Sequence, residues 1–264
     1  MQLSILLVLA TIFAALPAHS SGSSPNPATK PMPKIEEDGY DWYSRHNRIK
    51  STQKKLNPKV VMIGDSITHH WAGIKSIGEI NDPATKKEWL NCFGEIPTLN
   101  MGYGFDRTQN VIWRLEKGEL QNIKPELVIV LIGINNFATT KKFKANTPAE
   151  TATGIRKILD LVNKSAPKAK ILLIGALPSF GPESSHRKNA AKLNEILANF
   201  KKENDYKGKL EYIDFGSEFL DENKLIKAGL TRDKLHPTAK GYEIFAKHIK
   251  PYLSNIKVKK SRSR

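Results

Sequence analysis

Six consecutive residues at positions 127–132 are drawn only from Leu, Val and Ile, with no polar residue among them. A short apolar run without alternation is typical of a central strand in a parallel sheet that is covered on both faces. Four further short segments predict four more strands: the apolar runs at 60–63 and 171–174, and the mixed segments at 98–101 and 210–213.

The segments between these runs have helical spacing. Apolar residues recur at i, i+3, i+4 and i+7 in 155–162, which is the pattern of one helix face. Comparable spacing predicts helices in 41–57, 83–93, 106–117, 193–200 and 242–252. Strands that alternate with helices indicate βαβ units and a parallel sheet. With 264 residues, 39% of them hydrophobic, the chain suits one α/β domain, which we place at 36–254.

The N-terminal segment predicts export. Residues 4–16 form an apolar run that is too short to span a bilayer, and small residues stand at −3 and −1 of a cut after Ser20. This pattern indicates a secretory signal peptide at 1–20 and a secreted or periplasmic protein. An uncleaved anchor is the alternative, since no Lys or Arg precedes the run. Residues 21–35 are predicted to be a flexible leader.

The net charge of +16 is spread along the chain. Its lysines are scattered, and they do not interleave with aromatic residues as in RNA-binding domains, so a solvated surface is favoured over a nucleic-acid site. The tail at 255–264 is basic and could contact an anionic surface. Cys92 is the single cysteine, which excludes an intramolecular disulfide and a cysteine zinc cluster. Its apolar neighbours favour a buried thiol. The sequence leaves the oligomeric state open.

Polar residues gather where the predicted strands end. Gly64-Asp65-Ser66 follows the first strand, and Ser66 opens a helix. The segments 102–106 and 133–136 follow the second and third strands, and the segment 233–237 lies just before the last helix. Because the carboxyl ends of parallel strands share one edge of a sheet, we expect these loops to converge.

The residue types at this edge fit nucleophilic catalysis. A serine hydroxyl needs a base to take its proton, and His236 titrates in the appropriate range. Asp233, three residues earlier, is placed to orient that imidazole. The N–H of Ser66 at a helix N-terminus and the amide of Asn135 are candidate donors to an oxyanion.

On these residues the sequence resembles the SGNH hydrolases, also called the GDSL-like esterase family. Gly64-Asp65-Ser66 matches the nucleophile block, Gly133-Ile134-Asn135-Asn136 the oxyanion block, and Asp233-x-x-His236 the acid and base block. Residues 42–46, 110–115 and 118–125 further resemble the branch of the platelet-activating-factor acetylhydrolase catalytic subunits and their bacterial relatives. The resemblance implies a flavodoxin-like three-layer α/β/α sandwich with five parallel strands and no metal or organic cofactor.

One block departs from the family pattern. The family usually has a glycine before the acidic residue of the second block, whereas this chain has Phe105 before Asp106. The N–H of either Phe105 or Gly104 is therefore the expected second backbone donor, since a backbone donor does not require glycine. Residues near these blocks are candidate substrate contacts: His69, Trp71, Asn136 and Arg107. His69-His70 does not indicate a metal pair, because adjacent helical residues point in different directions.

These features predict a serine esterase that hydrolyses short-chain esters, acetyl esters first, of a carbohydrate or cell-surface glycan. A phospholipid or lysophospholipid acylhydrolase is the first alternative. A glycan- or surface-binding protein that keeps the fold without turnover is the alternative from another class. A dinucleotide loop is excluded because Arg107 stands at its third glycine position, and the Gly-x-Ser-x-Gly elbow is excluded by Thr68.

Overall fold

A parallel five-stranded sheet forms the centre of the molecule. The computed structural model describes residues 26–37, 39–72, 82–206 and 208–256. The strands lie in the order β2-β1-β3-β4-β5, and every neighbouring pair is parallel. Their bounds are β1 Val60–Gly64, β2 Thr98–Gly102, β3 Leu127–Leu131, β4 Lys170–Ile174 and β5 Leu210–Ile213. This confirms the predicted sheet and the three-layer fold class.

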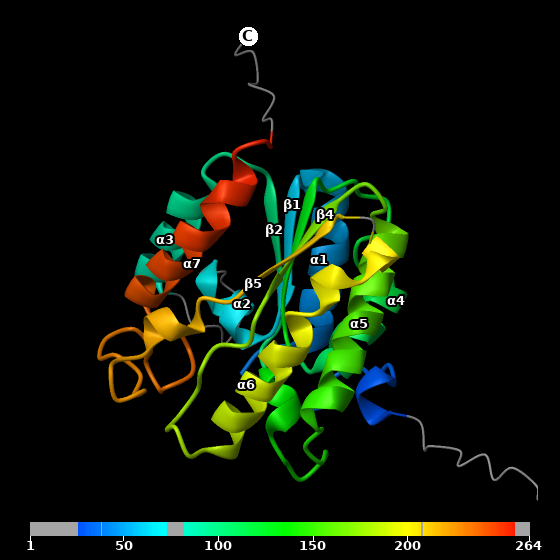
Figure 1. The fold of residues 1–264 in the computed structure, drawn as a ribbon. Helices are drawn as coiled ribbons and strands as arrows, with labels where there is room; N and C mark the ends of the chain where they lie inside the picture. The colour runs from blue at the N-terminus through cyan, green and yellow to red at the C-terminus, as the bar shows by residue number, and fades with distance from the viewer. Residues whose placement is uncertain (1–25, 38, 73–81, 207, 257–264) are drawn as a thin grey trace, which may run out of the picture.

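Helices cover both faces of the sheet, as Figure 1 shows. Helices α3 and α7 pack together on one face, and α4 and α5 lie on the other with α6 beside α5. The bounds are α1 Trp42–Leu56, α2 Ser66–Trp71, α3 Pro83–Phe93, α4 Thr108–Glu116, α5 Pro148–Ser165, α6 Ser185–Leu197 and α7 Ala239–Leu253. Short 3-10 helices occur at Pro27–Thr29, Ile134–Phe137, Phe200–Lys202, Asn204–Tyr206 and Gly216–Phe219. None of the helices in the described ranges is both long and apolar enough to cross a membrane.

Two paired glycines at the tips of β1 and β2 let α2 approach the sheet. Gly64 and Gly102 are register partners. A Cβ at Gly64 would lie 2.2 Å from Oγ1 of Thr68, and one at Gly102 would lie 2.2 Å from the N of His69. Any side chain at either position would displace α2, the helix that begins with Ser66. The glycine of the Gly-Asp-Ser block is therefore a packing requirement.

Residues 26–35 differ from the predicted flexible leader. Ala28 is fully buried, and its carbonyl accepts the hydroxyl of Thr108 at 2.8 Å. The side chain of Asn110 donates to the carbonyl of Pro33 at 2.6 Å. Side chains of α4 thus hold a segment that has no apolar period of its own, so hydropathy could not reveal its attachment. The predicted signal peptide, the first part of the leader and the last eight residues lie outside the described ranges.

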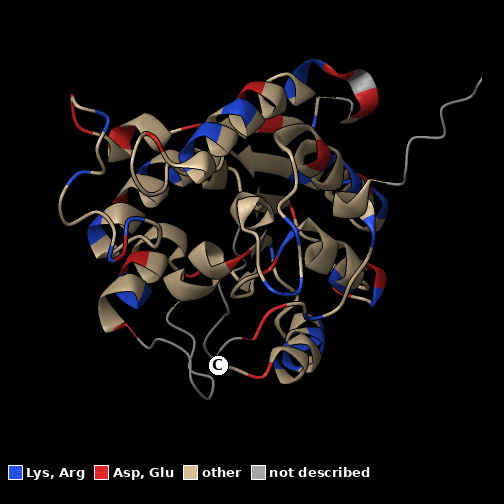
Figure 2. Cartoon of the chain, turned by 90° about the horizontal axis from the view of Figure 1, so that it is seen from below, with Lys and Arg blue, Asp and Glu red and all other residues tan. Residues whose placement is uncertain are grey.

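The structure confirms that Cys92 is buried, and it shows how the positive charge is distributed. Cys92 is buried, and burial raises the pKa of its thiol to about 12, so it is a poor nucleophile. Figure 2 shows Lys and Arg around the whole outline of the molecule, interspersed with Asp and Glu. The positive charge is thus distributed over many elements of the described chain.

Candidate active site

Ser66 lies at the first position of α2, directly after β1. Asp65 is the N-cap, and its carboxylate accepts the N–H of Ile67 at 2.9 Å. Burial raises the pKa of Asp65 to about 7. No acceptor among the described residues contacts the N–H of Ser66, which is one of the unsatisfied donors that every helix N-terminus has. Ser66 therefore presents both a hydroxyl and a free N–H.

His236 bridges Ser66 and Asp233. Its Nε2 lies 2.9 Å from Oγ of Ser66, and its Nδ1 lies 2.6 Å from Oδ2 of Asp233. Since the ionised carboxylate can only accept, the imidazole proton is on Nδ1 and Nε2 is free to accept the hydroxyl proton. Ser66 and His236 are 170 positions apart in the chain, and the structure brings them together. With Asp233 they have the arrangement of a nucleophile, a base and an orienting acid.

The acid is held by its own loop. Oδ1 of Asp233 accepts the backbone N–H groups of Leu235 at 3.1 Å and His236 at 2.8 Å. Partial burial by itself would raise the pKa of Asp233, but the hydrogen bonds from the backbone and imidazole of His236 outweigh it and lower that pKa. Asp233 is therefore a carboxylate at neutral pH.

Three candidate donors lie in the loops that follow β2 and β3. Gly104 donates its N–H to Nδ1 of His69 at 3.2 Å. Phe105 has φ +60°, and its N–H has no partner within the described ranges. Asn135 uses one amide hydrogen on the carbonyl of Asp106 at 3.0 Å, which leaves its second for another acceptor. The free donors are thus those of Phe105 and Asn135.

A buried ionic network supports the loop that carries Phe105. Arg114 is fully buried and donates to the carboxylate of Asp106 at 2.8 Å and to that of Glu119. Glu119 also accepts the hydroxyl of Tyr103 at 2.5 Å and contacts Nδ1 of His46 at 2.8 Å. Because Asp106 in turn accepts the Asn135 amide through its carbonyl, the network fixes both free donors. Sequence reasoning missed this network, since charged residues in amphipathic segments usually face water.

The four candidate substrate contacts are all buried. Trp71 is stacked on Tyr242, with 5.2 Å between the ring centroids, inside the core between α2, α3 and α7. Asn136 accepts the N–H of Thr108 at 3.0 Å and donates within the same cluster. His69 holds Gly104, as described above. Arg107 donates to the carbonyl of Ala138 at 2.9 Å. Each one supports the walls of the site and exposes almost no surface to a ligand.

A second histidine, His70, lies beside His236. The His70 ring is 5.0 Å from the His236 ring, and its Nδ1 is 3.0 Å from Nη2 of Arg232. Because a guanidinium only donates, this Nδ1 carries no proton. Burial, followed by the nearby charges of His236 and His69, lowers the pKa of His70 to about 3. His70 is therefore neutral, and it links α2 to the loop of the base.

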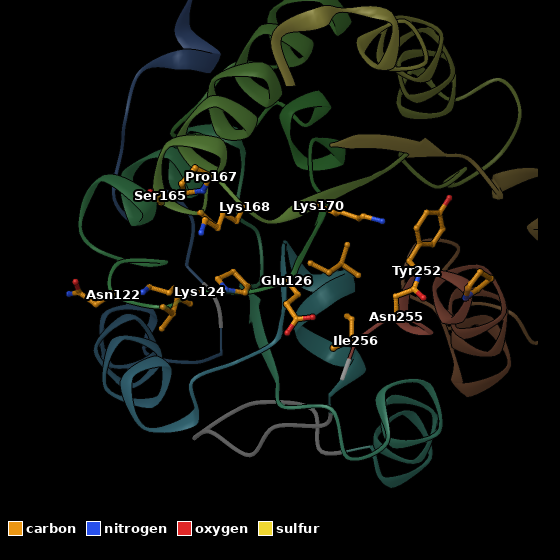
Figure 3. A pocket seen from close by; sticks show the side chains of 15 residues that line it. Asn122, Lys124, Glu126, Ser165, Pro167, Lys168, Lys170, Tyr252, Asn255 and Ile256 are labelled. Carbon is orange, nitrogen blue, oxygen red and sulfur yellow. The ribbon is translucent and has the colours of Figure 1, made fainter. Parts of the chain in front are cut away.

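A large cavity lies away from Ser66 and its partners. A cavity of about 940 Å³ lies at the amino-terminal edge of the sheet, lined among others by Lys124, Lys170 and Tyr252 (Figure 3). It lies at the opposite strand ends from Ser66, and none of the converging loops reaches it. No group of three or more His, Cys, Asp or Glu side chains within the described ranges could hold a metal ion.

Comparison with known proteins identifies the family. Residues 62–244 match the GDSL-like Lipase/Acylhydrolase family, and this region contains Ser66, Asn135, Asp233 and His236. The chain belongs to the GDSL-like lipase/acylhydrolase family. It is an ester hydrolase of the GDSL type. Similar curated proteins of this family are acetylhydrolase subunits. Platelet-activating factor acetylhydrolase IB subunit alpha2 of Homo sapiens is 34% identical over 233 residues, 88% of this chain and 90% of that protein. The alpha1 subunit of Rattus norvegicus is 35% identical over 181 residues, 67% and 68% of the two chains.

Solved structures of GDSL-like hydrolases share the fold. A GDSL-like lipase from Bacteroides thetaiotaomicron has a TM-score of 0.62 at 21% identity, covering 80% of this chain and 96% of that one. An acetyl-xylooligosaccharide esterase from Geobacillus Stearmophilus has a TM-score of 0.54 at 20% identity, covering 78% and 97%. At these identities the likeness concerns the fold alone.

Proposed function

We propose that this GDSL-like hydrolase is a serine esterase that removes short acyl groups, acetyl first, from an esterified carbohydrate or cell-surface glycan. The observation that carries the proposal is the hydrogen-bonded series from Ser66 through His236 to Asp233, with distances of 2.9 and 2.6 Å. These distances are within the range for proton transfer from a nucleophile to a base. No rearrangement is needed before the hydroxyl can react.

In the proposed mechanism, Oγ of Ser66 attacks the ester carbonyl while Nε2 of His236 takes its proton. Asp233 stabilises the imidazolium that forms and keeps its proton on Nδ1. His236 then protonates the departing alcohol, which leaves an acyl-serine. A water molecule, deprotonated by the same Nε2, attacks the acyl-serine and releases the acid.

The oxyanion of each tetrahedral intermediate is assigned to three donors: the N–H of Ser66, the N–H of Phe105 and the side-chain amide of Asn135. Gly104 is not among them because its N–H is donated to His69. One donor of this kind contributes about 2.7–4 kcal/mol to the lowering of the barrier. Phe105 supplies its donor from a left-handed backbone conformation, φ +60°, which is a costly position for a large residue.

A preference for short acyl groups is supported by the relatives. The curated proteins with 34–35% identity are named for acetyl hydrolysis. A carbohydrate alcohol is suggested by the predicted export of this chain. The Geobacillus protein, which acts on acetylated xylooligosaccharides, shows that the fold accommodates such an alcohol.

A phospholipid acylhydrolase is the second candidate, because those same curated relatives are named for platelet-activating factor. A screen of acetate release separates the two, with acetylated xylan, acetylated sialate, acetylated peptidoglycan and a 2-acetyl phospholipid as substrates. Preference for a glycan supports the first candidate. A preference for the phospholipid, or release of long fatty acids faster than acetate, contradicts it.

Covalent labelling tests the nucleophile independently of the substrate. A fluorophosphonate probe is expected to label the wild-type protein and to leave Ser66→Ala unlabelled. Ser44→Ala is a matched control, since Ser44 is an exposed serine at the start of α1. Labelling of Ser66→Ala at the wild-type rate, or no labelling of either protein, contradicts the proposal and favours a binding protein without turnover.

We further infer that the chain is exported, as the apolar run at 4–16 and the small residues before position 21 suggest. The mass of the mature protein tests this inference. A product that begins at Ser21 supports it, and an intact N-terminus in the expressing cell contradicts it.

A further inference from the structure

A second cavity adjoins the loop that carries Asp233 and His236. It has a volume of about 330 Å³, and its walls come from residues 180–181, 225–229, 231–232 and Lys234. Three basic side chains line it: Lys227, Arg232 and Lys234. Apolar side chains form other parts of the wall, namely Phe180, Leu225 and Ile226. No acidic side chain is among its described lining residues.

None of the three basic side chains forms an ion pair with a described carboxylate, although the ammonium of Lys227 donates to the carbonyl of Glu218 at 3.1 Å. Arg232 forms no ion pair with a described carboxylate, and its guanidinium contacts the neutral His70 instead. Lys234 likewise has no carboxylate partner among the described residues. Asp233, the acidic residue beside them, has both oxygens engaged by its own loop and by His236. An anion entering the cavity would therefore meet uncompensated donors.

The walls are fixed before any ligand binds. Arg187 donates to the carbonyls of Ser179 at 3.0 Å and Lys224 at 2.9 Å, and also to that of Phe180. Phe180 donates its N–H to the carbonyl of Lys234 at 2.8 Å, although both residues have left-handed backbones with φ +57° and +64°. Two strained residues joined in this way indicate a loop pair held in one geometry, which is common at ligand sites.

Arg232 connects this cavity to the catalytic base. Its N–H donates to the carbonyl of His236 at 2.9 Å. Its guanidinium reaches back to His70, whose ring lies 5.0 Å from that of His236. Most of its five N–H donors remain available, because the contact with His70 uses one of them. A substrate group bound at Arg232 would thus lie close to an ester held at Ser66.

We propose that this cavity is an anion-binding subsite for the alcohol part of the substrate. Arg232, assisted by Lys234, binds a carboxylate or phosphate on that alcohol, and the apolar wall with Phe180 covers the adjoining carbon skeleton. His70 acts as a positioning residue that aims the guanidinium. The inference rests on the proposed esterase function and narrows its substrate class to acylated alcohols that carry a negative charge.

The test compares three acetyl esters that differ only in the group at C6 of the sugar, which is neutral in one and anionic in two. They are an acetylated methyl glucoside, the corresponding glucuronate and the corresponding 6-phosphate, assayed with wild type, Arg232→Gln and Arg232→Lys. Wild type is expected to prefer an anionic ester in kcat/KM, mainly through KM. In Arg232→Gln the ratio of anionic to neutral kcat/KM should fall roughly 10- to 100-fold, the range for a charge-assisted hydrogen bond. Arg232→Lys should restore part of that ratio.

Controls separate this subsite from general surface charge. Lys54→Gln removes one exposed positive charge on α1, far along the chain from the cavity, and should leave the ratio unchanged. The wild-type ratio should fall as salt is raised, because exposed charges are screened. The glucuronate and the 6-phosphate esters show which anion the cavity binds. A higher kcat/KM for either one than for the neutral glucoside supports the subsite. Equal kcat/KM for all three esters, or an equal loss with every ester in Arg232→Gln, overturns it.

The outcome remains interpretable if the esterase proposal fails. In that case no ester is cleaved and Ser66 is not labelled, but glucuronate and inorganic phosphate can still be titrated into Ser66→Ala by calorimetry. Binding that is lost in Ser66→Ala combined with Arg232→Gln supports the anion site alone. Absence of binding overturns it.

Discussion

Replacement of two adjacent asparagines by alanine is expected to affect different properties, namely activity at Asn135 and stability at Asn136. Asn135 is partly exposed and makes one described side-chain hydrogen bond, to the carbonyl of Asp106. Asn136 is fully buried, accepts the N–H of Thr108 at 3.0 Å, and has further partners around its amide nitrogen, the closest at 2.9 Å. We assign the first to oxyanion stabilisation and the second to the structure of the loop.

The magnitudes follow from these contacts. Asn135→Ala removes one oxyanion donor, so kcat should fall about 10²- to 10³-fold. Its cost in stability is about 1 kcal/mol, the net value of one hydrogen bond. Asn136→Ala leaves several buried groups of its cluster without partners, at about 1–3 kcal/mol for each. A loss of about 3 kcal/mol lowers Tm by roughly 6–12 °C in a domain of this size.

The assay uses p-nitrophenyl acetate, so that the natural substrate need not be known, together with thermal unfolding followed by circular dichroism. Kinetics are measured well below the Tm of both variants, so that each is folded. If Asn135→Ala keeps kcat within fivefold of wild type, Asn135 is not an oxyanion donor. If Asn136→Ala loses more kcat than Asn135→Ala while its Tm is unchanged, the two assignments are reversed.

Four other substitutions probe the site and its support. Asp233→Asn should lower kcat about 10⁴-fold at pH 7 through the wrong imidazole tautomer; a loss below tenfold on p-nitrophenyl acetate argues against the triad. Phe105→Gly should keep kcat within about threefold and raise stability by no more than about 1 kcal/mol, as left-handed strain is relieved against chain entropy; loss of activity would assign the ring a role in binding. Glu119→Gln should cost about 3–5 kcal/mol in urea unfolding, because buried Arg114 loses a countercharge; an unchanged urea midpoint would show that Arg114 does not depend on it. Burial raises the pKa of Asp65 to about 7, so the folded chain binds more protons than the unfolded chain between about pH 4 and 7, and stability falls as pH rises through that window. Asp65→Asn keeps an N-cap and should flatten this slope in urea midpoints from pH 4 to 8; an unchanged slope contradicts the assignment.

Strands and helices could be predicted because each carries its own period. The run at 127–132 reads as a doubly covered strand because β3 is buried along its whole length between two helical layers. The segment 26–35 has no apolar period, so its sequence predicts a flexible leader although the structure shows it packed against α4. It is held through hydrogen bonds such as those from Thr108 and Asn110, and such bonds leave no period in the sequence.

Candidate contacts show a second limit of sequence reasoning. The four candidate contacts stand next to site residues in the chain, yet all four are buried in the structure: His69, Trp71, Asn136 and Arg107. On a helix or a tight loop, the residue beside a functional one points in another direction. Proximity in sequence therefore identified the right loops but not the side chains that face the substrate.

The amino-acid sequence alone was enough to predict the parallel sheet and the family, and to single out Ser66, Asp233 and His236, because apolar runs mark the strands and the carboxyl ends of parallel strands share one edge. The packed structure was needed to show that, among the described residues, the N–H of Phe105 has no partner while that of Gly104 does, because His69 contacts Gly104 across the site. It also decided that Arg114 is buried among carboxylates and that Arg232 contacts His70. These are contacts between side chains distant in sequence, and their geometry exists only once the layers have packed.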